Sequence, residues 1–167
     1  MNHYIYHMKT LLVLLSCGIC FGQFQSAYAQ SSNDQNPTLA TLNHVALHVV
    51  DLEKSTAFYQ DLLKLTVIPE PFNDGMHTWF SMGETSELHL ISGAKQLPEP
   101  DKFNHLCFSV KSMDDFIKTI QQRGIPYSDF PGKANTITLR PDGVRQLYLQ
   151  DPDGYWIEIN DAIPAKK

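Results

Sequence analysis

Leu42–Val49 reads LNHVALHV, and a closely similar segment, Phe103–Val110, reads FNHLCFSV. In each copy Asn-His follows one apolar residue, and apolar side chains then alternate with small or polar ones. Side chains alternate between the two faces of a β-strand, so the apolar residues of each copy share one face, and His44 and His105 lie on the other. The duplication predicts two related modules, each opening with a strand that carries a histidine.

Each of these strands is followed by a pattern typical of an amphipathic helix. Asp51 can cap a helix running to about Leu63, and Ser112 can cap a helix that ends near Gly124. Strand-like runs separated by turn signals follow, near residues 66–69, 77–82 and 87–92 in the first copy and near residues 127–130, 136–140, 146–150 and 155–160 in the second. We therefore predict an α+β fold of two tandem βαβββ modules, residues 40–95 and 102–162, whose curved mixed sheets surround a metal-binding cleft.

The first 29 residues have the features of a secretory signal peptide. Lys9 is their only charged residue, an apolar run follows it, and Ala27-Tyr28-Ala29 provides a small-residue cleavage site. The apolar run is shorter than the roughly 20 residues that a spanning helix needs, so we expect no stable membrane span. A membrane anchor and a lipoprotein lipidated at Cys17 are the alternatives. We expect an exported protein, periplasmic or secreted, with a disordered lead-in over residues 30–39.

Composition excludes some classes of partner and of covalent support. The chain has 13 Lys and Arg against 18 Asp and Glu, a net charge of −5 that becomes −6 when Lys9 is removed with the signal peptide. With no basic run, nucleic acid is not an expected partner. Of the 3 cysteines only Cys107 lies beyond residue 29, so the mature chain can form no internal disulfide.

Four candidate metal ligands fall at corresponding places in the two modules: His44, His89, His105 and Glu158. His89 and Glu158 each lie between two large aliphatic residues, which places all four on the strand faces that point away from the helices. A hydrogen-bonded core residue is the alternative for any one histidine, but a buried carboxylate is costly unless it is paired or bound to a cation. Together they predict one divalent transition metal ion, Ni, Zn, Co, Fe or Mn rather than Ca.

Weaker candidates surround this set. His48 and Ser109 lie on the ligand-bearing faces and could contact a substrate or orient a ligand, with plain wall residues as the alternative. Arg140 and Tyr148 belong to the late hairpin and could recognise an anionic substrate group, with surface positions as the alternative.

Several motifs resemble the vicinal oxygen chelate superfamily, which includes glyoxalase I, fosfomycin-resistance and bleomycin-resistance proteins and extradiol dioxygenases. The resemblance covers residues 41–161 and rests on NHVA at 43–46, DLEKS at 51–55, NHL at 104–106 and DPDGYWIE at 151–158. It implies that the metal ligands of glyoxalase-I-like members fall on His44, His89, His105 and Glu158. The sequence departs from that pattern at His89, where Glu is usual, and at Lys64, where glycine is common.

The resemblance implies a metal-dependent lyase of the lactoylglutathione lyase type. Its substrate would be a hemithioacetal or a similar small α-oxo or α-hydroxy carbonyl bound through two oxygens, with Glu158 as the catalytic base. The alternatives are an extradiol Fe(II) dioxygenase, a thiol transferase acting on fosfomycin and a non-catalytic drug-binding resistance protein. The resemblance also leaves open whether paired modules come from one chain or from the two chains of a homodimer.

Overall fold

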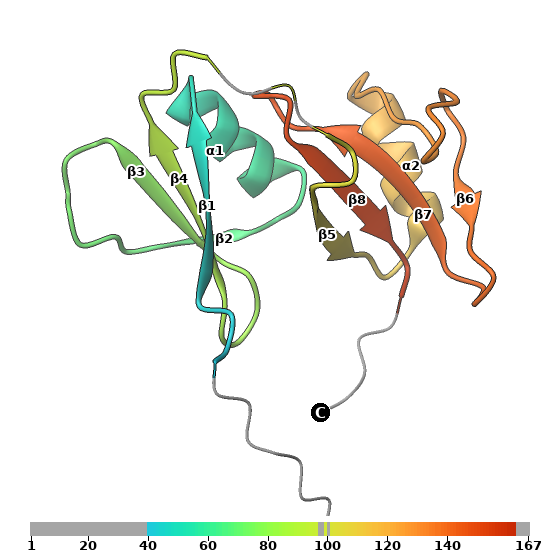
Figure 1. Cartoon of the computed structure of the whole chain (residues 1–167), viewed down its shortest axis with the longest axis horizontal. Coiled ribbons are helices and arrows are strands. Elements are labelled where there is room, and N and C mark those ends of the chain that lie inside the picture. Colours follow the sequence, from blue (N-terminus) through green and yellow to red (C-terminus); the bar gives the residue numbers. More distant parts are fainter. Residues whose placement is uncertain (1–39, 97–98, 100, 163–167) are drawn as a thin grey trace, which may run out of the picture. The chain divides into compact units, whose positions relative to one another are not determined.

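The computed structural model describes residues 40–96, 99 and 101–162. The predicted signal peptide, Cys17 and the lead-in lie outside this part of the chain. Within it, two helices and eight strands follow one another (Figure 1). They are β1 (His44–Val49), α1 (Leu52–Asp61), β2 (Thr66–Ile68), β3 (His77–Ser81), β4 (Glu87–Ser92), β5 (His105–Ser109), α2 (Met113–Gln122), β6 (Thr138–Leu139), β7 (Arg145–Gln150) and β8 (Trp156–Asn160).

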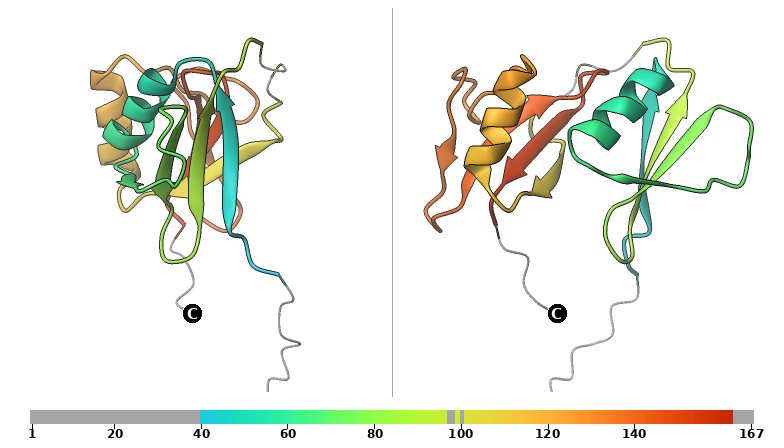
Figure 2. Two further views of the ribbon diagram at one scale, coloured as in Figure 1. Left: turned by 90° about the vertical axis from the view of Figure 1, so that its left-hand side faces the viewer. Right: turned by 180° about the vertical axis from the view of Figure 1, so that it is seen from behind.

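The strands form two four-stranded sheets with the same internal order. One sheet runs β1-β4-β3-β2 and the other β5-β8-β7-β6. In both, the opening strand pairs in parallel with the last strand of its module, and the other pairs are antiparallel. Each helix lies along one face of its own sheet (Figure 2). The predicted α+β fold of two βαβββ modules with mixed sheets is confirmed.

In the first module, the alternating pattern of β1 decides which face is covered by α1. Leu47 and Val49 are buried, whereas His44 on the opposite face is exposed. The Asp51 carboxylate accepts a hydrogen bond from the backbone N–H of Lys54 at 3.0 Å, which caps α1 as predicted. Burial of the apolar face therefore leaves the histidine-bearing face of the sheet free for a site.

In the second module, Ser112 caps α2 through a 3.2 Å hydrogen bond that its hydroxyl accepts from the backbone N–H of Asp115. Met113 and Ile120 on the inner side of α2 are fully buried. Gly124, with a φ of 66°, follows the helix in the left-handed conformation that favours glycine. The predicted start and end of this helix are confirmed to within two residues.

The strand expected near residues 127–130 is not formed. Ser128 makes only isolated bridges, and the Asp129 carboxylate accepts two following backbone N–H groups in a turn. The Lys102 ammonium donates to the carbonyl oxygens of residues 129 and 130 at 3.1 and 3.2 Å. These contacts satisfy backbone groups that a strand would have paired, and only the short Thr138–Leu139 remains as the outer strand of this sheet.

The turn at residues 151–154 makes hydrogen bonds to the first module. Tyr59 donates its hydroxyl hydrogen to Asp151 at 2.8 Å, and Ser55 donates to Asp153 at 2.5 Å. Asp151, Tyr59 and Ser55 are all buried, so these bonds compensate for removing polar groups from water. The DPDG segment thus has a structural role in joining residues far apart in sequence.

Across the described ranges, no helix is long and apolar enough to cross a membrane.

Candidate functional site

The first half of the candidate site lies on the exposed face of the sheet that contains β1 and β4. Parallel pairing places Ala46 opposite His89, and this register brings the ring of His44 over that of His89. The two rings are stacked with centroids 4.2 Å apart, and the indole of Trp79 stacks on the other side of His89 at 3.8 Å. Because His89 lies between two rings, it is only 8% exposed although it faces away from the helix.

Hydrogen bonds fix the protonation pattern of these two histidines. Nδ1 of His44 lies 2.7 Å from the side-chain oxygen of Asn43, so Nδ1 carries the hydrogen and Nε2 presents a lone pair. Nε2 of His89 lies 2.7 Å from a carboxylate oxygen of Glu87, so a neutral His89 presents its lone pair on Nδ1. Glu87 is therefore a direct partner of His89. Both rings line a cavity of about 510 Å³.

The second half of the site lies on β5, β7 and β8. Nδ1 of His105 donates to the backbone carbonyl of Lys102 at 2.8 Å, which leaves the lone pair on Nε2. That Nε2 lies 3.3 Å from Oε2 of Glu158. Two electron-rich atoms at this separation need a shared proton, which makes the contact an ion pair, or a common cation. His105 also lines a cavity of about 370 Å³.

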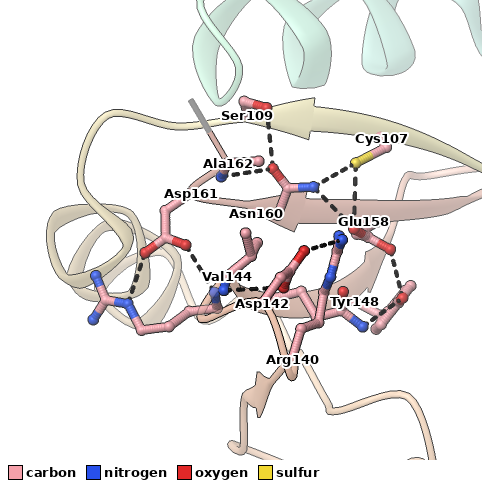
Figure 3. Close-up of polar contacts among 12 residues, drawn as sticks. Cys107, Ser109, Arg140, Asp142, Val144, Tyr148, Glu158, Asn160, Asp161 and Ala162 are labelled. Atoms are coloured by element: carbon pink, nitrogen blue, oxygen red, sulfur yellow. Dashed lines mark hydrogen bonds and ion pairs between the residues drawn. The ribbon is translucent and has the colours of Figure 1, made fainter. Parts of the chain in front are cut away.

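A hydrogen-bond network holds the Glu158 carboxylate (Figure 3). Tyr148 donates to Oε2 at 2.5 Å, and the side-chain amide of Asn160 donates to Oε1 at 3.0 Å. The Cys107 thiol lies 3.4 Å from Oε1. Burial by itself raises the pKa of Glu158, but the hydrogen bonds from Tyr148, Asn160 and Cys107 outweigh it and lower the pKa. Glu158 is therefore a buried carboxylate that stays ionised.

The network has the opposite effect on the neighbouring acids. Burial and the hydrogen bond to Glu158 raise the pKa of Tyr148 above its ordinary value. Burial of the thiol group, followed by the charge of the nearby Glu158 carboxylate, raises the pKa of Cys107 to about 12, although the residue as a whole is exposed. Cys107 is therefore a protonated neighbour of the carboxylate at neutral pH and not a nucleophile.

The weaker candidates divide into two groups. Tyr148 donates directly to Glu158, whereas Ser109 donates to Asn160 at 3.0 Å and so supports the carboxylate through that residue (Figure 3). Arg140 pairs with Asp142 at 2.6 Å, and both side chains are exposed. The backbone carbonyl of His48 accepts a 3.1 Å hydrogen bond from the Tyr155 hydroxyl. Substrate contacts by these residues stay predictions.

The structure brings the four predicted ligands together as two pairs, His44 with His89 and His105 with Glu158. In the described part of the chain, no group of three or more His, Cys, Asp or Glu side chains is close enough to hold a metal ion. Each pair by itself supplies too few ligands for a transition metal site. Assignment of all four residues to one ion stays a prediction.

Sequence reasoning missed some residues that take part in these contacts. Asn43 precedes the first histidine, and its repeat in Asn104 was visible, but its hydrogen bond to that ring was not predicted. Asn160 lies two residues after Glu158 on one strand face, which is the signal that could have identified it. His77 faces the same cavity as His89, and only the pairing of β3 with β4 shows this.

Known proteins share both the sequence pattern and the fold. The chain is 30% identical over 139 residues to Glyoxylase I 4 of Arabidopsis thaliana, which covers 76% of this chain and 75% of the plant protein. It is 29% identical to Glutathione transferase FosA of Serratia marcescens, covering 73% of this chain and 81% of that one. The solved structure of the fosfomycin resistance protein FosX from Listeria monocytogenes matches with a TM-score of 0.61 at 23% identity, covering 76% of this chain and 97% of that chain.

Each βαβββ module begins with a histidine, and the last strand of the second module carries a glutamate. This arrangement agrees with a match to a known protein family. The sequence profile of the Glyoxalase/Bleomycin resistance protein/Dioxygenase superfamily matches residues 41–159, which is nearly the whole described fold. The chain therefore belongs to this superfamily, also known as the vicinal oxygen chelate superfamily.

Proposed function

We propose that the protein is a metal-dependent, glyoxalase-I-like lyase acting on a small α-oxo or α-hydroxy carbonyl compound such as the hemithioacetal of methylglyoxal. The observation that carries this proposal is the contact at 3.3 Å between Nε2 of His105 and Oε2 of Glu158, which brings two predicted ligands from different strands together. The similarity to a plant protein named Glyoxylase I 4 supports the choice of reaction class.

One divalent transition ion, Ni, Zn, Co, Fe or Mn, would be held by His44, His89, His105 and Glu158. The donor set fits such an ion, because three imidazoles and one carboxylate are ligands that these metals prefer. The hydrogen bonds on Nδ1 of His44 and His105 leave Nε2 as the nitrogen that would bind the ion in both, which is the arrangement of ligating histidines. When bound, the ion would polarise two adjacent substrate oxygens and so acidify the neighbouring C–H group.

The residues of the chain would then move the proton. Glu158 is the group that would take a proton from the substrate carbon and return it to the adjacent carbon, since it is ionised and buried beside His105. Tyr148 and Asn160 would hold the carboxylate in place through their hydrogen bonds. Glu87 would fix the ring of His89 in the first half of the site.

Because each module presents one pair of ligands, a complete site would combine the first module of one chain with the second module of another. A symmetric dimer would then contain two such sites. This arrangement accounts for the two separate pairs and for the open cavity beside each of them. The partner is thus a second copy of this chain, and the substrate is a small molecule.

Metal analysis and a substrate panel test the proposal. We expect about one divalent ion per chain in the purified protein and loss of most of it in His105→Ala and in Glu158→Ala. Thioester formation from methylglyoxal and a series of thiols would be followed with each metal supplied separately, and catechols would be supplied in parallel under oxygen.

Unchanged metal content in both variants would contradict the site. Ring cleavage of a catechol by the Fe form, without thioester formation by any form, would favour an extradiol dioxygenase. Inactivity in both assays would favour a drug-binding protein.

Export and processing after Ala29 are part of the proposal. The support is the apolar run and small-residue pattern of the first 29 residues. The intact mass of protein from the exporting cell should correspond to a chain that begins at Gln30. Retention of Met1 or a lipid on Cys17 would contradict it.

A further inference from the structure

The cavity beside His44 and His89 has an aromatic wall that the proposed chemistry does not use. The ring centroid of Phe72 lies 4.6 Å from that of His77 and 6.2 Å from that of Trp79. These three residues line the same cavity of about 510 Å³. Phe72 is 59% exposed, which leaves apolar ring surface available for a ligand.

Strand pairing places His77 on the cavity face together with the predicted ligand His89. β3 and β4 are adjacent and antiparallel (Figure 1), and Trp79 lies directly opposite His89 and His77 directly opposite Ile91. Directly opposed residues of an antiparallel pair share a face. A ligand in this cavity would therefore contact the His77 side of the wall as well as the metal-binding side.

The ring of His77 is oriented by Asp74. Nδ1 of His77 lies 2.9 Å from Oδ1 of Asp74, and the same oxygen accepts the backbone N–H of Met76 at 2.8 Å. These two hydrogen bonds, that of Met76 first, lower the pKa of Asp74, so this carboxyl is ionised at neutral pH. An ionised carboxylate can only accept, so Nδ1 of His77 carries the hydrogen.

The remaining ring nitrogen of a neutral His77 is consequently a hydrogen-bond acceptor. Nε2 makes no hydrogen bond to any residue that the structure describes. The His77 side chain is 17% exposed, so the ring is largely sheltered by its neighbours while it lines the cavity. An acceptor in an aromatic cavity selects a ligand that combines a flat apolar ring with a hydroxyl hydrogen.

We propose that His77 is a substrate-binding residue that accepts a hydrogen bond from a hydroxyl group on a flat aromatic or conjugated ligand whose ring lies against Phe72 and Trp79. The inference rests on the proposed function, because the cavity is that of His44 and His89. It narrows the substrate from a methyl-substituted carbonyl to one whose substituent is a planar ring carrying a hydroxyl group.

The test uses metal-free full-length protein and two probes, 2-naphthol and 2-methoxynaphthalene. In the second probe a methyl group replaces the hydroxyl hydrogen of the first. Binding is measured by titration calorimetry. We expect 2-naphthol to bind about threefold to tenfold more tightly, the ratio that one hydrogen bond provides. His77→Phe should abolish this preference. Phe72→Ala should weaken the binding of both probes by a similar factor.

The matched control is Thr78→Val at the neighbouring position of β3, where the Thr78 hydroxyl bonds Thr56 on α1 and does not line the cavity. It should keep the preference of the unmodified protein. If His77→Phe does not fold, as judged by thermal unfolding, His77→Gln replaces it and should retain part of the preference through its side-chain oxygen.

Absence of the preference in the unmodified protein, or its persistence in His77→Phe, would overturn the inference. Unchanged binding of both probes in Phe72→Ala would place the ligand elsewhere and would also overturn it. Because no metal is added, the outcome is separate from the lyase assay. A preference without thioester formation removes only the lyase, and thioester formation without a preference removes only this binding site.

Discussion

At the scale of single residues, the candidate site is defined by which nitrogen of each histidine is already occupied. Asn43 and the carbonyl of Lys102 hold Nδ1 of His44 and His105, whereas Glu87 holds Nε2 of His89. The two opening histidines are thus equivalent in chemistry as well as in sequence. His89 differs, and among the predicted ligands it is also the one at which the sequence departs from the glyoxalase-I-like pattern.

Replacement of Tyr148 by Phe should weaken metal binding, because the hydroxyl donates the 2.5 Å hydrogen bond that holds Oε2 of Glu158. Loss of a partner of this kind costs about 10-fold to 100-fold in metal affinity. Since that bond lowers the pKa of Glu158, protons should compete with the metal at higher pH in Tyr148→Phe than in the unmodified protein. Metal titrations at pH values from about 5 to about 8, the range around neutrality, measure the metal affinity and its dependence on pH.

The control is Tyr127→Phe, which removes a buried tyrosine hydroxyl bonded to Gln121 and not to Glu158. Equal metal affinity in the Tyr148 and Tyr127 variants would show that the Tyr148 hydroxyl does not support the ligand.

Tyr59→Phe should change both the stability at neutral pH and its dependence on alkaline pH. Loss of the hydrogen bond to buried Asp151 should lower the free energy of unfolding by about 1–2 kcal/mol. Burial, followed by the Asp151 carboxylate, raises the pKa of Tyr59 well above its ordinary value. The unfolded tyrosine ionises near pH 10 while the folded one stays neutral, so this stability is complete below about pH 10 and is lost above it.

The measurement is urea unfolding at pH values from about 7 to about 11, a range that spans the ordinary tyrosine pKa. The difference in stability between the two proteins should be constant below about pH 10 and should narrow above it. A difference that stays constant to the highest pH would show that Tyr59 does not contribute to alkaline unfolding.

At the scale of elements, the two modules repeat the same strand and helix but differ in their turns. Lys64 follows α1 with a φ of 57°, whereas Gly124 follows α2 with a φ of 66°. The left-handed conformation is open to glycine and costs other residues about 1 kcal/mol or more. The first module therefore carries a strained turn that the second module avoids.

Lys64→Gly should raise the free energy of unfolding by about 0.5–1 kcal/mol. The free energy gained by relieving the left-handed strain exceeds the entropic cost of ordering a more flexible glycine. Chemical denaturation measures the change. Gln60→Gly, at an exposed position inside α1, is the control and should lower stability by about 1 kcal/mol. Destabilisation of similar size by both substitutions would contradict the assignment of strain to Lys64.

At the scale of the whole molecule, the distribution of ligands between two modules matters more than any single contact. His44 and His89 belong to the first sheet, and His105 and Glu158 belong to the second. The turn at Asp151 and Asp153 joins the modules through Tyr59 and Ser55 instead of through these ligands. A site assembled between two chains leaves this connection intact.

Mixing two inactive variants tests the assembly. In a dimer whose sites combine modules from different chains, His44→Ala paired with His105→Ala gives one site with both defects and one site with neither. After random subunit exchange, about one quarter of the unmodified protein's metal sites should reappear. The measurement is tightly bound metal per chain, before and after the two variants are refolded together.

His44→Ala mixed with His89→Ala is the matched control, because both defects lie in the first module and no pairing yields an intact site. Recovery in this control, or no recovery in the test mixture, would contradict a site shared between chains.

The sequence alone determined the local structure and the face on which each candidate ligand lies. The alternation in Leu42–Val49 and Phe103–Val110 predicted β1 and β5, because one face of each strand must be apolar to pack beneath a helix. The capping residues Asp51 and Ser112 likewise predicted where α1 and α2 begin. Both are local rules that follow from side-chain periodicity and backbone hydrogen bonding.

The grouping of the ligands and the residues that support them follow from contacts between distant parts of the chain. The pairing of β3 with β4 placed Trp79 and His77 beside His89, and the pairing of β7 with β8 placed Tyr148 against Glu158. The predicted strand at residues 127–130 was wrong, because only Ser128 pairs with Tyr148 before the chain turns at Asp129, where Lys102 binds the carbonyl groups of residues 129 and 130. These contacts depend on strand register and on groups far apart along the chain, and periodicity within a single segment carries no information about either.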